Sequence, residues 1–444
     1  MKKLLITLLC LANVTVFKTV TAQSKYTNHI NEVRRIFNSS DLGKKYHGTI
    51  LIAEGENVLF QNASGENPSN EPNTVNTRYD LASMGKMFAA TAIMQLEGQG
   101  KLSLEQTIGE ILPDYPNEEA RSIKVKHLLS HTSGMGDYFS PAFFENQEHI
   151  KSLEDFLPYF VNDPINFTPG ETMRYSNAGY IVLGLIIQKI SGSIYTAYLE
   201  ENIFKPAGMK NTGPLIGSAG GGLSTVHDLY KFGLALQQGR LISAHALKTM
   251  TTDHLGHGYG YGLTLKQFNG HHIYGHNGGA PGIAGELDMV KGTPLIIVTM
   301  TNRHPLDGWV QMRSHIRKEF FGMTPELEKF FNTEEVIKTY KLKGFAEASR
   351  QLSNLDNNII DKNTFHYAEQ FANQGKMEEA IEVMKLIVQA YANEPYPYAF
   401  LADFQLQAGL KEEAIKNYKR SLEINPYDKE VIKRLKALEK KSEN

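Results

Sequence analysis

Apolar and polar positions alternate in two separate parts of the first 300 residues. The stretch HGTILIAEGENVLFQNA (47–63) contains two short β-rich runs around an EGEN turn, and residues 271–303 contain three more, separated by glycine-rich breaks. Between and after them the period is helical, over 83–97, 178–191, 225–238 and 308–321. Strands at both ends of a segment with helices between them predict an α+β fold, in which an antiparallel sheet is flanked by helices.

The last third of the chain has a different pattern. GKMEEAI (375–381) recurs as GLKEEAI (409–415), 34 residues later, and this is the tetratricopeptide period. We therefore predict tetratricopeptide repeats with a capping helix over 361–444. Residues 326–360 are predicted to be a helical linker or a degenerate repeat, and residues 23–325 the α+β domain.

The first residues, MKKLLITLLCLANVTVFKTVTAQS, have two lysines, a short apolar core and small residues up to Ala22. This arrangement predicts a secretory signal peptide over 1–22 and an exported protein, periplasmic or secreted. The apolar run is too short to span a bilayer, so we expect no membrane span after cleavage. Cleavage also removes Cys10, the only cysteine, which leaves no disulfide and no thiolate site.

The net charge of the chain bears on whether it binds nucleic acid. The formal net charge is −2 with mixed signs, and a nucleic-acid surface needs a clustered basic face. We therefore expect no nucleic acid.

One stretch, YDLASMGKMFAATAIMQLEG (79–98), carries a single ionisable side chain near the start of its apolar body, Lys86. A buried amine costs several kcal/mol unless it is compensated. Ser83 lies three residues earlier, on the same face of the first helical turn. A serine at a helix start beside a desolvated lysine is a candidate nucleophile with its activating amine. The alternative is that Ser83 caps the helix and Lys86 extends to water.

Two further motifs carry candidate chemistry. Among three Tyr-x-Asn sequences, Tyr175-Ser-Asn177 follows a Pro-Gly turn and precedes an apolar helix. In an extended segment these two side chains face the same side. The strand-like YGHNGGAPG holds His276-Asn277-Gly278-Gly279, whose glycines allow close approach of a ligand. The alternative for the second motif is a glycine-rich hairpin with an exposed histidine.

Together these motifs resemble the serine β-lactamase and penicillin-binding superfamily, whose pattern is Ser-x-x-Lys, Tyr-x-Asn and then Lys-Thr-Gly or His-x-Gly. The segments HLLSHTSGM (127–135), FTPG (167–170) and GGLSTVHDLYKF (221–232) also look like its class C β-lactamase, D-alanyl-D-alanine carboxypeptidase and esterase branch. The resemblance covers roughly residues 26–322.

The resemblance implies a catalytic role for three side chains. Ser83 would be the nucleophile, Lys86 its activating amine, and Tyr175 the group that relays protons to the leaving group. The backbone N–H groups of Ser83 and Gly279 would form the oxyanion hole. Which of Lys86 and Tyr175 acts as the acylation base is left open.

The resemblance also implies that Asn177, His276, Asn277 and Gly278 bind substrate. A histidine in place of the lysine of Lys-Thr-Gly is mostly neutral, and its ordinary pKa lets its charge change between about pH 5 and 8. Tight binding of carboxylate-bearing β-lactams is therefore less expected, and β-lactams, D-amino-acid peptides and esters all stay open as substrates.

Two other sets of polar residues could carry chemistry. Asn302 and Arg303, after the strand PLIIVTMT, could supply the missing positive charge, although an arginine at a strand end is more commonly solvated. His127 and His131 could bind a metal if both lie on one helix, but no carboxylate cluster accompanies them. We expect no metal and no cofactor.

The leading hypothesis is an exported serine hydrolase that cleaves an amide or ester through an acyl-enzyme on Ser83, in a small-molecule substrate such as a β-lactam, in a D-amino-acid peptide or in an ester. Two alternatives from other classes stay open. One is a non-catalytic cell-wall or peptide-binding protein that keeps the fold, and the other is an interaction scaffold that binds a protein partner through its repeats.

Overall fold

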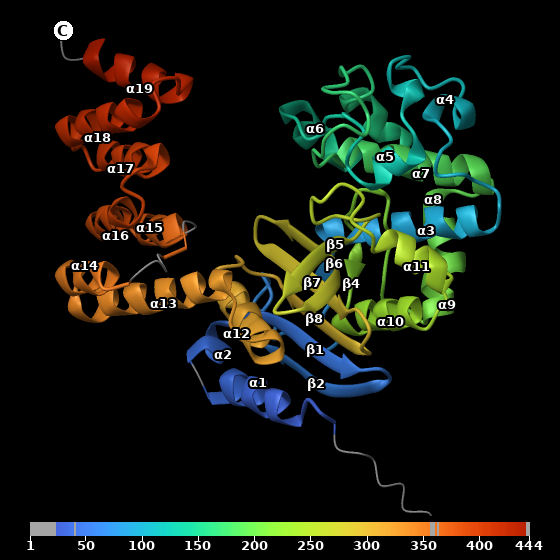
Figure 1. The fold of residues 1–444 in the computed structure, drawn as a ribbon, viewed down its shortest axis with the longest axis horizontal. Coiled ribbons are helices and arrows are strands. Elements are labelled where there is room, and N and C mark those ends of the chain that lie inside the picture. The colour runs from blue at the N-terminus through green and yellow to red at the C-terminus, as the bar shows by residue number, and fades with distance from the viewer. Residues whose placement is uncertain (1–23, 40, 356–359, 362–363, 441–444) are drawn as a thin grey trace, which may run out of the picture.

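The computed structural model describes residues 24–39, 41–355, 360–361 and 364–440 (Figure 1). The expected signal peptide, residues 1–22, lies outside the described residues. The strands are β1 (Gly48–Glu54), β2 (Asn57–Ser64), β3 (Tyr79–Asp80), β4 (Leu223–Ser224), β5 (Thr264–Phe268), β6 (His271–Ala280), β7 (Ile283–Val290) and β8 (Leu295–Thr301).

The helices fall into two groups along the chain. Those of the first group are α1 (Thr27–Ser39), α2 (Asp41–Lys45), α3 (Lys86–Gly98), α4 (Ile108–Ile111), α5 (Val125–Leu129), α6 (Pro141–Asn146), α7 (Asn177–Ser191), α8 (Tyr195–Leu199), α9 (Lys205–Ala207), α10 (Val226–Gln237), α11 (Ala244–Met250) and α12 (Trp309–Phe321). Short 3₁₀ or π turns are η1 (Ala82–Gly85), η2 (Ala120–Ser122), η3 (Gln147–His149), η4 (Glu154–Tyr159) and η5 (Glu200–Phe204).

The main sheet joins both ends of the first domain. Its order is β2-β1-β8-β7-β6-β5, and every neighbouring pair is antiparallel. The predicted α+β fold is therefore confirmed, and the four expected helices correspond to α3, α7, α10 and α12. The sequence analysis missed β5 and the two-residue pair β3–β4, because half-exposed or very short strands carry little periodicity.

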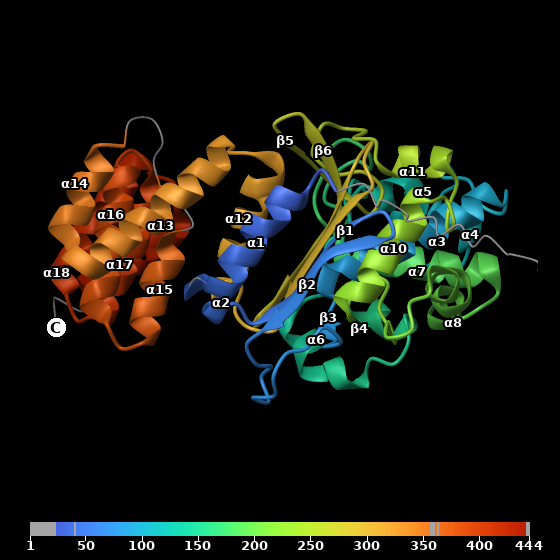
Figure 2. The same ribbon diagram turned by 90° about the horizontal axis from the view of Figure 1, so that it is seen from below.

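Both faces of this sheet are covered, as the edge-on view shows (Figure 2). On β1, Leu51 and Ala53 face a core shared with α3, α7 and α10, whereas Ile50 and Ile52 face one shared with α1 and α12. Alternation along the strand assigns successive residues to opposite faces. The face toward α3 is the one that carries the candidate chemistry.

The second group of helices forms an all-helical region beside the sheet domain (Figure 1). It comprises α13 (Pro325–Lys343), α14 (Phe345–Ser353), α15 (Phe365–Asn373), α16 (Met377–Ala390), α17 (Pro395–Gln407), α18 (Lys411–Ile424) and α19 (Lys429–Lys440). Helices α16 and α18 begin 34 residues apart, and each follows a glycine in the left-handed region, Gly375 (φ 76°) or Gly409 (φ 79°). One apolar core extends from Val336 on α13 to Phe404 on α17, so the helical packing already begins at α13.

The longest apolar helix of the first domain, α7, is buried over most of its length. Within the described ranges, none of the individual helices has the length and apolarity needed to cross a membrane. Only the bent pair formed by Asn177–Ser191 and Tyr195–Ala207 passes on length and composition.

Candidate active site

Ser83 lies in the tight turn η1, directly before α3. The preceding residue, Ala82, has a φ of 43°, an unfavourable conformation for a residue with a side chain. The turn is held from the facing loop, where Gly221 N–H donates to the carbonyl of Ala82 (3.0 Å) and Leu81 N–H donates to that of Gly222 (2.9 Å). A Cβ on Gly220 would lie 2.3 Å from the Ala82 oxygen, so this loop can approach Ser83 only because it is glycine-rich.

Lys86 is the first residue of α3 and is fully buried, with 0% of its surface exposed. Its Nζ contacts the Ser83 Oγ at 3.3 Å, the Asn177 Oδ1 at 2.6 Å and the Ala219 carbonyl oxygen at 2.5 Å. The alternative in which Lys86 extends to water is therefore wrong. The amine is held in place by oxygen atoms of three different segments.

The environment of Lys86 brings the pKa of its amine close to neutral pH. Burial lowers the pKa of its amine to about 7, and the negative charge of Asp137 acts in the opposite direction. An amine with this pKa is unprotonated in a large fraction of molecules at neutral pH, so it can accept a proton.

Tyr175 lies directly over this amine, with the Lys86 Nζ 4.8 Å from its ring centroid. Burial raises the pKa of its phenol to about 12, although a hydrogen bond with the Ser83 side chain partly offsets the increase. The His131 ring stacks on Tyr175 at 4.0 Å between centroids. Tyr175 keeps 39% of its surface exposed, so the phenol borders both Ser83 and solvent.

Asn177 is not in an extended segment, as the sequence analysis assumed. It is the first residue of α7, because the Ser176 side chain caps the helix by accepting from Gly179 N–H. Its Oδ1 accepts from Lys86 and its Nδ2 donates to the Asp137 Oδ2 at 2.6 Å. Tyr175 and Asn177 still meet at Lys86, but only one Nδ2 hydrogen remains for a substrate.

His276 lies on β6 and is 2% exposed. Its Nδ1 lies 2.5 Å from the Asn277 carbonyl, which can only accept, so Nδ1 carries the proton and Nε2 accepts from the Tyr259 hydroxyl (3.0 Å). Burial, followed by the positive charge of Lys86, lowers the pKa of His276 to about 3. The expected charge change between pH 5 and 8 is therefore wrong, because the neutral ring is buried and satisfied at both nitrogens.

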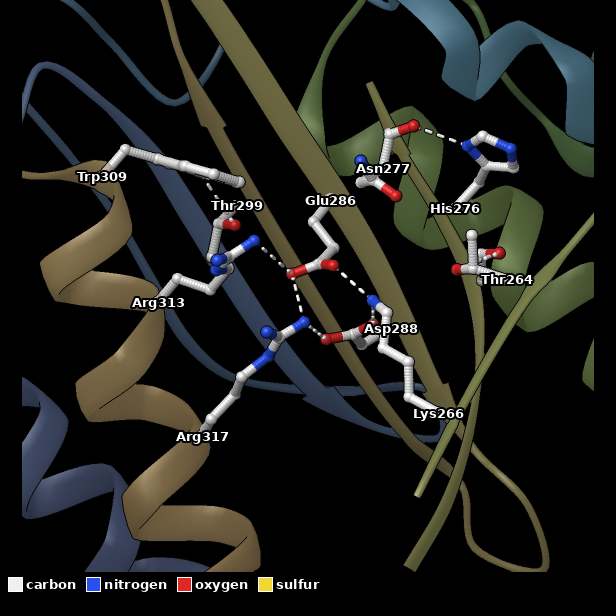
Figure 3. Close-up of polar contacts among 11 residues, drawn as sticks. Thr264, Lys266, His276, Asn277, Glu286, Asp288, Thr299, Trp309, Arg313 and Arg317 are labelled. Atoms are coloured by element: carbon white, nitrogen blue, oxygen red, sulfur yellow. Dashed lines mark hydrogen bonds and ion pairs between the residues drawn. The ribbon is translucent and has the colours of Figure 1, made fainter. Parts of the chain in front are cut away.

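The glycines after His276 fit the turn that holds the serine. A Cβ on Gly278 would lie 2.2 Å from the Leu81 carbonyl oxygen, so only glycine allows β6 to pack against η1. Gly279 follows on an exposed part of the strand. Asn277 is exposed too, but alternation puts its side chain on the opposite face of β6 from His276, as Figure 3 shows.

Two residues lie at the site that no motif assigned to it, Asp137 and His131, although His131 was a candidate metal ligand. Asp137 contacts Asn177, and His131 stacks on Tyr175 while its Nδ1 accepts from Ser176 N–H (3.1 Å). Burial is the main cause that lowers the pKa of His131 well below its usual range, so its ring is neutral. Both lie in or just after HLLSHTSGM, a segment that carries the resemblance to the family, and the non-glycine residue His131 has a φ of 58° there.

The other polar candidates are engaged elsewhere. Asn302 forms a reciprocal pair with Asn73, and Arg303 donates to the carbonyl of Asn67. Helix α5 ends at Leu129, so His127 and His131 do not share a helix. The residues that the structure describes contain no group of three or more His, Cys, Asp or Glu side chains placed to hold a metal.

Comparison with known proteins identifies relatives of this chain. The chain is 36% identical over 178 residues to penicillin-binding protein 4* of Bacillus subtilis (strain 168), a match that covers 38% of this chain and 39% of that protein. It is 27% identical over 317 residues to the putative penicillin-binding protein PbpX of the same organism, covering 64% and 75%. The chain thus spans well under half the length of the first of these relatives.

A solved structure shares the fold. The penicillin-binding protein of Bacillus halodurans superposes with a TM-score of 0.57 at 29% identity, covering 64% of this chain and 99% of that one. A family model described as "Beta-lactamase" matches residues 48–318, which is more than half of the sequence and contains every residue of the site. The chain belongs to the beta-lactamase family.

Proposed function

We propose that this protein is an exported serine hydrolase that cleaves an amide or ester through an acyl-enzyme on Ser83. The observation that carries the proposal is the position of the Lys86 amine, which is fully buried and lies 3.3 Å from the Ser83 hydroxyl. A non-catalytic protein has no need for a desolvated amine beside a serine, because burying it opposes folding.

In the proposed reaction one side chain acts as the general base and another, of higher pKa, acts as the general acid. Lys86, whose pKa is lowered to about 7, takes the proton of the Ser83 hydroxyl as its oxygen attacks the substrate carbonyl. Tyr175, whose pKa is raised to about 12, stays protonated and donates to the leaving group. This assignment makes Lys86 the acylation base. Lys86 then passes the proton that it took from Ser83 to Tyr175, so both groups return to their starting states. Water attacks the carbonyl carbon of the acyl-enzyme and gives a proton to Lys86, and as the bond to Ser83 breaks the serine oxygen takes that proton back.

When Ser83 attacks, negative charge develops on the carbonyl oxygen of the substrate. The N–H groups of Ser83 and Gly279 are the proposed oxyanion hole, since Gly278 holds this end of β6 against the turn that bears Ser83. Asn177 and His276 line the base of the site, and their main contacts are with protein atoms.

The proposed substrates are neutral esters or amides, including D-amino-acid peptides, in preference to anionic β-lactams. His276 occupies the place of a permanent cation but is neutral and buried, and Arg303 is engaged with Asn67. Penicillin is still a reasonable probe, because the relatives are described as penicillin-binding proteins.

Covalent labelling tests the proposal. Intact-mass analysis after exposure to a fluorophosphonate or to benzylpenicillin should show one adduct on the wild type and none on Ser83→Ala. A panel of nitrocefin, short-chain p-nitrophenyl esters and D-amino-acid peptides then identifies the substrate class. Absence of any adduct or turnover in the wild type would instead favour a non-catalytic peptide-binding protein.

We also propose that the helical region is a tetratricopeptide-like module that binds a protein partner. Its support is the 34-residue offset between α16 and α18 and between the two motifs that begin them. Export is proposed from the first 22 residues, and the expected location is periplasmic or secreted.

A further inference from the structure

Three oxygen atoms surround the Lys86 amine, and two of them can only accept hydrogen bonds. The Ala219 carbonyl oxygen (2.5 Å) is one, and the Asn177 Oδ1 (2.6 Å) is the other. The third, the Ser83 Oγ at 3.3 Å, can both donate and accept. A neutral amine has two hydrogens and one lone pair. When both hydrogens go to the two pure acceptors, the lone pair points at the Ser83 hydroxyl.

This arrangement depends on which end of the Asn177 amide faces Lys86. If the amide turned over, its NH₂ group would face the amine and would compete for the lone pair. Lys86 alone does not fix the orientation, because a neutral amine can act as donor or acceptor. The Ala219 carbonyl is fixed by the backbone, so Asn177 is the one contact that can reverse.

Asp137 fixes the orientation of the Asn177 amide, because it binds the end of the amide that does not face Lys86. Its Oδ2 lies 2.6 Å from the Asn177 Nδ2, and a carboxylate can only accept, so the NH₂ group must face Asp137 and Oδ1 must face Lys86. Asn177 is 8% exposed, which leaves little water to satisfy the reversed amide.

We propose that Asp137 is a positioning residue for the reaction, which locks the Asn177 amide so that the lone pair of Lys86 is directed at Ser83. The idea rests on the proposed acyl-enzyme function. Asp137 acts through Asn177, and it also adds a negative charge near an amine that is otherwise desolvated.

The other ionisable groups around Lys86 do not compete with Asp137 for this role. Tyr175 and Tyr180 face the amine with their rings, at 4.8 and 5.5 Å, and burial raises the pKa of each phenol. His131 and His276 are neutral, because burial lowers the pKa of each. Asp137 is thus the negative charge that acts on Lys86.

The test compares Asp137→Asn, Asp137→Ala and Asn177→Ala with the wild type, by the rate of Ser83 acylation as a function of pH. Asp163→Asn is the matched control, since this exposed carboxylate lies beside Gly136 and is not bonded to Asn177. Asp137→Asn should lower the plateau rate about tenfold or more, and should move the acidic limb to lower pH because the compensating charge is lost. Asp163→Asn should change neither.

A double-mutant cycle shows whether Asp137 acts by fixing the orientation of the Asn177 amide or has only a general structural role. If Asp137 acts through Asn177, Asp137→Asn should cause little further loss of plateau rate in the Asn177→Ala background. The shift of the limb should persist in both backgrounds. Equal losses of rate in both backgrounds, or an unmoved limb, would overturn the proposal. Thermal unfolding of each variant shows whether it is folded.

One readout does not depend on catalysis. Titration of Lys86 by NMR in protein labelled with ¹³C at the lysine Cε should give a lower pKa in Asp137→Asn than in the wild type. If the wild type forms no acyl-enzyme but this shift is seen, the proposed function fails and the electrostatic action of Asp137 on the amine stands. An identical titration in both proteins would contradict the proposal whether or not the protein is a hydrolase.

Discussion

Two groups of buried charges lie on opposite faces of the same sheet, and their composition differs. On the α12 face, the carboxylates of Glu286 and Asp288 are surrounded by Lys266, Arg313 and Arg317 (Figure 3). On the α3 face, Lys86 is fully buried and has three neutral oxygens as direct partners. In the first group each charged side chain lies beside groups of opposite charge, whereas Lys86 has no oppositely charged group among its direct partners in the part of the chain that the structure describes.

Both environments lower a pKa, but the effect on charge is opposite, because a lowered pKa keeps a carboxylate charged and makes an amine neutral. Burial alone would raise the pKa of Glu286, but Lys266, Arg317 and Arg313 outweigh it and hold that pKa well below its usual range. Glu286 therefore keeps its charge and ties β7 to α12 and β5. Burial brings the pKa of Lys86 to about 7, within reach of proton transfer. The ion-paired carboxylate of Glu286 therefore stabilises the fold, whereas the amine of Lys86, whose direct partners are neutral, can exchange a proton near neutral pH.

Exchanging each of the two lysines, Lys86 and Lys266, for methionine should separate these roles most clearly. Lys86→Met should lower the rate of Ser83 acylation by about 10²–10⁴-fold, because the general base is lost. Its unfolding free energy should change little, since the cost of burying an amine is removed along with its hydrogen bonds. Lys266→Met should do the reverse, with acylation kept and stability lowered. Denaturant unfolding and labelling kinetics on both variants measure this, and equal effects would deny the distinction.

The next largest effect should come from breaking the paired cluster. Glu286→Gln removes one of the two carboxylates that Lys266 and Arg317 share, and loss of one member of a buried ion pair typically costs about 3–5 kcal/mol. Glu335→Gln is the control, because the Glu335–Lys338 pair is exposed and pairs of this kind contribute about 0–1 kcal/mol. Urea unfolding of both variants provides the comparison, and similar midpoints would show that the cluster contributes no more than a surface pair.

The two regions should also respond to pH in different windows. Acylation of a neutral ester should increase through an acidic limb near pH 7, as Lys86 loses its proton. The stability from Glu286 should be complete above its unfolded pKa of about 4.3 and should decline as pH falls below it, because the folded-state pKa is lowered. Parallel measurements of acylation and unfolding from pH 3 to 9 would test this. A limb below pH 5 would exclude Lys86 as the base.

Only the α3 side of this comparison could be predicted from the sequence, because the ion pairs on the α12 side join residues of separate strands and a helix. The positions of Ser83, Lys86 and Tyr175 follow from local patterns, since a lone lysine in an apolar helix signals an unusual environment. The lock by Asp137 could not be predicted, because it joins residues 40 apart through one amide contact. The state of His276 could not be predicted either, because it depends on Tyr259 and on a strand end packed against η1.

Truncation tests how far the helical region is independent of the site. The sheet's core on the α12 side ends at Phe321, whereas the helical core begins at Val336 on α13. Removal of 325–444 should therefore leave a soluble protein that acylates at a rate close to that of the full chain. Removal of only 360–444 should expose the apolar faces of α13 and α14 and lower solubility. Loss of acylation in the shorter fragment would show that the helices complete the site.

The smallest expected effect concerns His276. Because its ring is neutral, buried and bonded at both nitrogens, its charge should not change between pH 5 and 8. The ratio of kcat/KM for a matched anionic and neutral ester should then stay constant across that range, apart from titration of the substrates themselves. His276→Gln should leave this ratio flat as well, while it loses one of the two hydrogen bonds. A preference for the anionic ester that grows toward pH 5 in the wild type and disappears in His276→Gln would show that the ring does become charged beside the substrate.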